Sequence, residues 1–116
     1  MATFPQVPVA EADDATLAIY RQAMAAAGAG SPALFFRHSA IYPGMLDWLW
    51  SAVGPDIAAG WPSREVWKIV DDHPVVALPG LPMDDAGRDT VRNMLVSYNR
   101  MNSMNYAIVG AVRGLV

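Results

Sequence analysis

The chain of 116 residues contains no cysteine at all. This absence excludes disulfides, thiol nucleophiles and thiolate metal sites. Histidine is also scarce, because only His38 and His73 occur and they lie far apart in the sequence. No spacing of potential ligands resembles a zinc or iron site, and we therefore expect no bound metal.

Charged residues are few, at 16% of the chain, and the net charge is −3 without any basic run. Nucleic-acid binding is therefore not expected, since it calls for a basic patch or stripe. The N-terminus lacks the positive region and apolar run of a signal peptide. No apolar run approaches the roughly 20 residues of a membrane span. We expect a cytoplasmic protein that contacts no membrane.

Apolar residues are abundant, at 53% of the chain, and include four Trp and seven Met. A chain of this length fits one domain with a sizeable core. So many large apolar side chains indicate either a large core or an apolar face for a partner.

Helix-start and helix-stop residues predict an all-α, compact domain over 1–116, with about five to six helices after an extended segment at 1–12. The expected helices are 15–27, 32–40, about 43–54, 64–71 and 85–116. A proline-rich loop precedes the last helix. Its residues 75–78, VVAL, could be a strand, but a single strand would have nothing to pair with.

The last helix carries the strongest periodic pattern, with apolar residues spaced by three and four over about seven turns. The expected inward positions are Val91, Met94, Leu95, Tyr98, Met101, Asn102, Asn105, Ile108, Val109, Val112 and Val116. Arg100 and Ser103 fall off this stripe.

Buried amides are costly unless each donor and acceptor is paired, so Asn102 and Asn105 on this stripe need an explanation. The helix could break at Asn102 or Ser103, which would cap a new helix. Alternatively, the break opens into a pocket where Tyr98 and Asn102 bind a carboxylate or a water.

Two stretches, LFFRHSAIYPGMLDWLW at 34–50 and SYNRMNSMNYAIVGAVRGL at 97–115, resemble one repeat of the group I 2-haloacid dehalogenases, the DehI-like family. The resemblance covers about residues 5–116, and its most specific part is the run Tyr98-Asn99-Arg100-x-Asn102-x-x-Asn105.

The resemblance implies an all-helical subunit of two repeats with the site between them. It also implies hydrolysis of 2-haloalkanoic acids by direct attack of an activated water, without a metal or organic cofactor. In that family an Asn holds the water and a Tyr lines the pocket, at positions that match Asn102 and Tyr98. Phe36 matches an aromatic residue at the apolar end of the site, and Asn105 belongs to the same motif.

Two features depart from the family pattern. Only one repeat is present, so either a homodimer rebuilds the two-repeat unit or the chain is one repeat of a longer protein. The family's water-activating Asp, near the start of the second helix, is also missing, because that region holds Pro32 and Ala33.

Other candidate residues are open to structural explanations. Arg37 could bind a substrate carboxylate bidentately or pair with an acid such as Asp47. His38 could act as a base, although a locally hydrogen-bonded role is the commoner one. We therefore expect either a dehalogenase that acts on a small carboxylic acid at a dimer interface, or a non-catalytic dimerisation or carboxylate-binding module.

Overall fold

The computed structural model describes residues 4–73, 80 and 82–115, and this part of the chain is all-α, as predicted. Its helices are a 3-10 turn at Val9–Glu11 followed by α1 at Asp14–Ala27, α2 at Leu34–Ser39, α3 at Met45–Ala58, α4 at Trp61–Asp71 and α5 at Asp85–Leu115. The described residues contain no strand. The alternative strand at 75–78 lies outside them.

Short-range capping explains the first helix. The Asp13 side chain accepts a hydrogen bond from the Thr16 backbone N–H at 2.8 Å, which satisfies a free donor of the first turn. The helix ends at Gly28, whose φ of 63° is the left-handed conformation that glycine adopts without steric cost. The predicted helix at 15–27 is confirmed. It begins one residue earlier, at Asp14, because Asp13 is its N-cap.

Three other helix ends differ from the prediction. Helix α2 begins at Leu34, two residues after the predicted start. The Ser31 hydroxyl donates to the Pro32 carbonyl, so it does not act as the helix cap. Helix α3 continues through Pro55 for one more turn, although a proline removes one helix hydrogen bond. Helix α4 begins before Ser63, with Pro62 in its first turn, where a missing N–H costs little.

Helix α5 is a single helix of 31 residues, so the predicted break at Asn102 or Ser103 is wrong. Asp84 caps its start by accepting from the Gly87 N–H at 2.8 Å, as expected. The Ser103 hydroxyl donates to the carbonyls of Asn99 and Arg100 in the preceding turn. This bond satisfies the hydroxyl inside the helix, and no new cap is needed.

The core lies where α1, α3 and the C-terminal half of α5 pack together. Its fully buried large side chains are Tyr20, Phe36, Leu49 and Ile108. The Phe36 ring packs edge-on against Trp50, with centroids 5.9 Å apart, and the Trp50 indole donates to the Gln22 side chain at 3.1 Å. The N-terminal segment is tied to this core, because the Tyr20 hydroxyl donates to the Val7 carbonyl at 2.9 Å.

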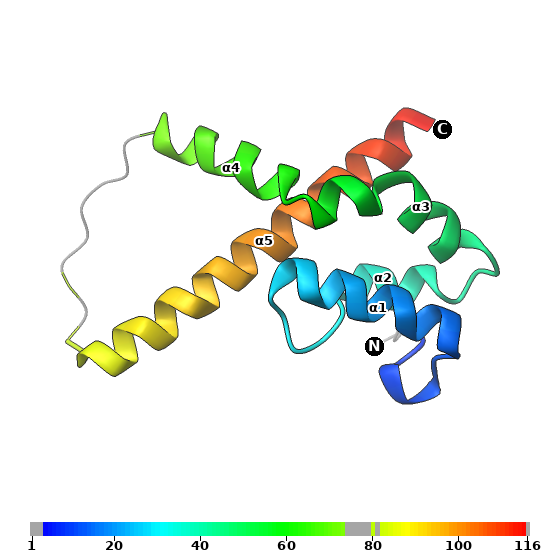
Figure 1. Ribbon diagram of the computed structural model, residues 1–116, viewed down its shortest axis with the longest axis horizontal. Coiled ribbons are helices and arrows are strands. Elements are labelled where there is room, and N and C mark those ends of the chain that lie inside the picture. The colour runs from blue at the N-terminus through cyan, green and yellow to red at the C-terminus, as the bar shows by residue number, and fades with distance from the viewer. Residues whose placement is uncertain (1–3, 74–79, 81, 116) are drawn as a thin grey trace.

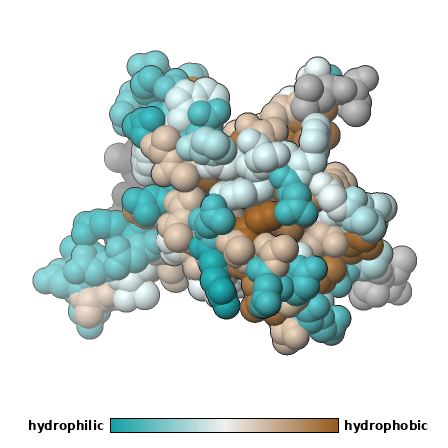
Figure 2. Space-filling model, turned by 45° about the vertical axis from the view of Figure 1, so that its right-hand side comes forward, coloured by the Kyte–Doolittle hydropathy of each residue, from teal (hydrophilic) through white to brown (hydrophobic). Residues whose placement is uncertain are grey.

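Two arms extend from this core. In Figure 1, α4 and the first half of α5 diverge from the point where they cross, while α1, α2 and α3 lie together on one side of the second half of α5. The radius of gyration is 16.4 Å, whereas a typical compact domain of this length would have about 13 Å. Figure 2 shows the ends of both arms as mainly hydrophilic, with apolar surface concentrated in the middle of the molecule. Within the described ranges, no helix has both the length and the apolar character needed to cross a membrane.

Candidate functional site

Helix α5 has two apolar sides, and the core buries only one of them. Ser103, Met104 and Ile108 are buried against the core. By contrast, large apolar residues of the predicted inward stripe are exposed: Met94, Leu95, Tyr98 and Val109 are at least half exposed. The predicted inward side is therefore wrong at five of its ten described positions, since Asn102 is exposed as well. Met101 and Ile108 are the clearest members that do face the core.

We call the exposed set the α5 stripe, defined as Met94, Leu95, Tyr98, Asn102, Tyr106 and Val109. At 100° per residue these positions fall within an arc of about 120° on one side of the helix. The stripe spans about 22 Å along the helix axis at 1.5 Å per residue. Exposed fractions reach 59% for Tyr98 and 80% for Tyr106. Such a contiguous run of exposed apolar side chains is typical of a contact surface.

The structure brings three of the candidate residues to one side of α5. Tyr98 and Asn102 lie one turn apart on the α5 stripe, and both are exposed. Asn105 lies one turn further along, at the edge of the stripe, and is partly buried. Its Oδ1 atom is enclosed and has no hydrogen-bond partner within the described protein. The amide of Asn105 thus retains an unused acceptor next to Asn102.

Phe36 and Arg37 do not join this group. Phe36 is fully buried against Trp50 in the core, so its ring walls no cavity in this structure. Arg37 is partly buried on α2, and its Nε has no hydrogen-bond partner among the described residues. The alternative ion pair of Arg37 with Asp47 is not formed in the described part of the chain, where the ion pairs are Lys68–Glu65 and Arg92–Asp89.

Both histidines make structural contacts, which for His38 was the commoner expectation. The Nδ1 atom of His38 lies 2.7 Å from the Pro5 carbonyl oxygen, and its ring packs edge-on against Phe4. These contacts hold the N-terminal segment on α2. His73 is exposed, with Nδ1 2.7 Å from the Ile69 carbonyl oxygen at the end of α4.

A hollow of about 510 Å³ lies beside Tyr98, between α5 and the turn that follows α1. Gly28–Ser31 form one wall, and Asn93, Ser97 and Met101 form the other with Tyr98. The Ser97 hydroxyl donates to the Gly28 carbonyl at 3.2 Å, which holds the two walls together. No Asp or Glu is among the residues that line it. The hollow therefore offers hydroxyl and amide groups but no general base.

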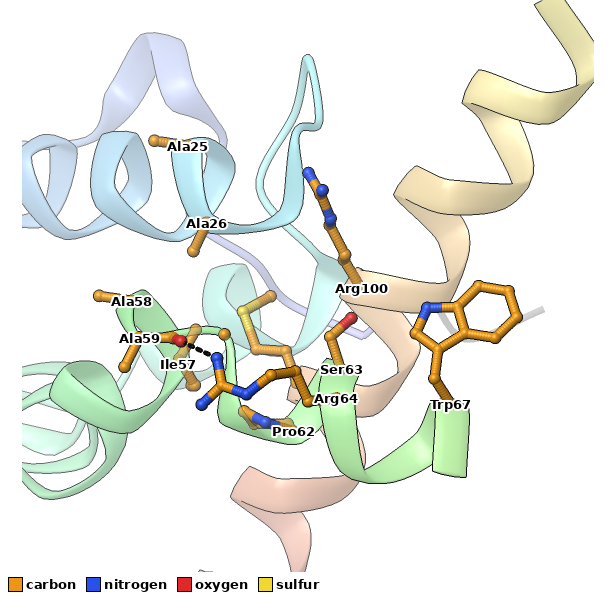
Figure 3. Close-up of a pocket in the computed structure, with 12 residues that line it drawn as sticks. Ala25, Ala26, Ile57, Ala58, Ala59, Pro62, Ser63, Arg64, Trp67 and Arg100 are labelled. Carbon is orange, nitrogen blue, oxygen red and sulfur yellow. Dashed lines mark hydrogen bonds between the residues drawn. The ribbon is translucent and has the colours of Figure 1, made fainter. Parts of the chain in front are cut away.

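A second cavity, of about 420 Å³, contains residues that the sequence analysis assigned no binding role. Figure 3 shows Ser63 and Arg64 on the first turn of α4, while Arg100 of α5 extends its guanidinium toward the end of α1, away from Arg64. Ser63 and Arg64 are far from Arg100 in the sequence, and no motif or spacing links them. Their approach depends on the packing of α4 against α5, which the sequence pattern does not reveal.

Among the described residues, no cluster of three or more His, Asp or Glu side chains could hold a metal ion. Comparison of the chain with protein-family models, with curated proteins and with solved structures finds no significant match.

Proposed function

We propose that this chain is a helical module of the 2-haloacid dehalogenase type, and that a second copy docks on the α5 stripe to complete a site for small 2-haloalkanoic acids. The observation that carries the proposal is the placement of Tyr98 and Asn102. They are exposed together, one turn apart, among the large apolar side chains of the stripe. A site formed between two modules requires its polar groups on an exposed face.

The apolar surroundings favour a second copy over open solvent. Met94, Leu95 and Val109 are each at least half exposed in the single chain, and burying them would contribute favourable free energy. The gain is about 25 cal/mol for each Å² of apolar surface removed from water. A twofold axis through the stripe gives both copies a Tyr98 and an Asn102 at the same interface.

In the proposed site the phenol and the amide orient the reactants. The Asn102 amide holds a water by donating and accepting hydrogen bonds, and the Tyr98 hydroxyl donates to the substrate carboxylate. The water oxygen forms a bond to C2 as the carbon–halogen bond breaks, and the halide leaves with the bonding electrons. The attacking water releases its proton to solvent, because this chain has no carboxylate at the position of the resembled family's Asp.

The absence of an Asp or Glu from the lining of the Tyr98 hollow favours a second candidate, which is binding of small carboxylates without turnover. Tyr98 and Asn102 suit this task, since neither is a base at neutral pH. We place either form of the module in the cytoplasm, with no cofactor and no nucleic-acid partner.

Halide release distinguishes the two candidates. The dehalogenase predicts that dimeric protein releases chloride or bromide from 2-chloropropionate or 2-bromopropionate, and that Asn102→Ala removes most of this activity. Gln6→Ala, at an exposed amide that lines neither the Tyr98 hollow nor the α5 stripe, serves as the control and is expected to retain activity. No release above buffer from folded dimeric protein would exclude the dehalogenase. Saturable binding of 2-chloropropionate to the same sample would then support the binding module.

A further inference from the structure

The cavity between α4 and α5 has the chemistry of an anion site. Its charged side chains are Arg64 and Arg100, and no Asp or Glu is among its lining residues. In the described part of the chain, neither arginine forms an ion pair with a carboxylate. Both side chains are exposed, and two guanidinium groups without a counter-charge give this part of the surface a positive potential in a chain whose net charge is −3.

A buried hydroxyl supplies a second observation. The Oγ atom of Ser63, in the same lining, is enclosed and has no hydrogen-bond partner within the described protein. Leaving such a group unpaired is unfavourable, so a ligand atom that accepts its proton is favoured. The first turn of α4 also contributes the positive end of its dipole at this point.

The arginines have structural uses that leave most of their donors free. Arg64 donates from Nη1 to the Ala59 carbonyl at the end of α3. Arg100 reaches the end of α1, where its Nη1 would lie 3.4 Å from a Cβ built on Gly28. Both positions suit a cation, because helix C-termini carry a partial negative charge. Each guanidinium has five N–H donors, so the remaining ones can bind an anion.

The rest of the cavity is apolar. Ala25 and Ala26 of α1, Ile57 of α3 and Met104 of α5 line it, and the Trp67 ring stands at one side (Figure 3). Guanidinium groups match the planar geometry of a carboxylate, and small apolar residues leave room for a hydrocarbon body. We propose that this cavity binds a small organic carboxylate with an apolar body.

This site is separate from the one assigned to Tyr98 and Asn102. Arg100 is two residues from each of them, which places it about 160° away around the helix. The inference therefore stands whether or not the α5 stripe forms a dehalogenase site, and a non-halogenated probe tests it without reference to turnover.

The experiment titrates benzoate into 15N-labelled full-length protein, with benzamide as the uncharged analogue. Benzoate is expected to shift the amide signals of Ser63, Arg64 and Arg100 and to bind at least about tenfold more tightly than benzamide, since the difference is the charge-assisted hydrogen bonding. Equal binding of the two compounds would overturn the proposal, as would the absence of shifts at these residues.

Two variants and a matched control locate the site. Arg100→Gln is expected to weaken benzoate binding by about tenfold or more. Arg113→Gln removes the same charge from an exposed position of the same helix and is expected to leave affinity unchanged. Equal weakening by both variants would reduce the effect to net charge and contradict the assignment.

Ser63→Ala keeps the test decisive if an arginine variant unfolds. This substitution removes the unpaired hydroxyl, so the melting temperature is expected to hold or rise while benzoate affinity falls severalfold. Unchanged affinity would remove Ser63 from the site. Inorganic phosphate that binds more tightly than benzoate would contradict the choice of carboxylate as the ligand class.

Discussion

Tyr20 joins the N-terminal segment to the core through one buried hydroxyl. Replacement by Phe removes the hydrogen bond to the Val7 carbonyl while the ring stays in place. Tyr20→Phe is expected to lower the free energy of unfolding by about 0.5–1.5 kcal/mol. Tyr42→Phe is the control, because Tyr42 is 62% exposed, and it is expected to change little. Urea denaturation measures both, and equal effects would contradict the role of the bond.

The same hydroxyl predicts a pH dependence. Burial raises the pKa of Tyr20 above its ordinary value of 10.0, and the positive charge of Arg37 offsets part of this rise. A raised pKa means that folding favours the protonated phenol. The contribution of this hydroxyl to the free energy of unfolding is therefore complete below pH 10, and it is lost as the pH rises through the pKa of Tyr20 in the folded state. Melting temperatures between pH 8 and pH 11 are expected to fall less steeply in Tyr20→Phe than in the unchanged protein.

Single residues show where sequence reasoning succeeds and where it stops. The structural role of His38 could be anticipated, because a lone histidine in a short helix most often bonds a nearby carbonyl. The position of Phe36 could not, since an aromatic residue suits both a cavity wall and a core. Only the packing of α2 against α3, which encloses the ring beside Trp50, decides between them.

Most helices could be predicted from the sequence because their ends depend on local chemistry. Asp13, Gly28 and Asp84 act within one turn of their positions. The continuation of α3 through Pro55 could not be predicted, because tertiary contacts outweigh the loss of one hydrogen bond. The inward side predicted for α5 was partly wrong for a related reason. Large apolar residues lie on both sides of this helix, and only the packing of the other helices decides that Met104 and Ile108 are buried while Leu95 is exposed.

Two helical glycines test the packing of these elements. A Cβ added at Gly54 of α3 would lie 2.8 Å from the Trp50 ring, which the Gln22 hydrogen bond and Phe36 hold in place. Gly54→Ala is expected to lower stability by about 1–3 kcal/mol through overpacking, less the gain in helix propensity.

Gly110 of α5 is the matched control, because a Cβ there meets nothing within 4 Å. Gly110→Ala is expected to raise stability by about 0.5–1 kcal/mol. Thermal denaturation of both variants checks the pair. A stabilised Gly54→Ala would show that the Trp50 ring does not lie over Gly54 as described.

In the molecule as a whole, the strongest apolar pattern of the sequence is divided between surface and core, because Leu95 and Tyr98 are exposed while Met101 and Ile108 face the core. This arrangement explains why the sequence predicts helices well but the candidate site only in part. Periodicity identifies apolar residues without telling whether the same chain or a second molecule covers them. The spacing of Tyr98, Asn102 and Asn105 places them on one side of α5, but Tyr98 and Asn102 are exposed and do not face inward as predicted. The cavity at Arg64 and Arg100 depends on the packing of α4 against α5.

The dissociation constant of the homodimer, measured by sedimentation equilibrium, tests the role of the α5 stripe most directly. We predict a dimer at micromolar concentration that Leu95→Glu weakens by at least about tenfold, because a charge would be buried at an apolar interface. Leu34→Glu changes a leucine of α2 that is 53% exposed, compared with 64% for Leu95, and is predicted to leave the dimer intact. A monomer at all accessible concentrations, or a dimer indifferent to Leu95→Glu, would contradict the account.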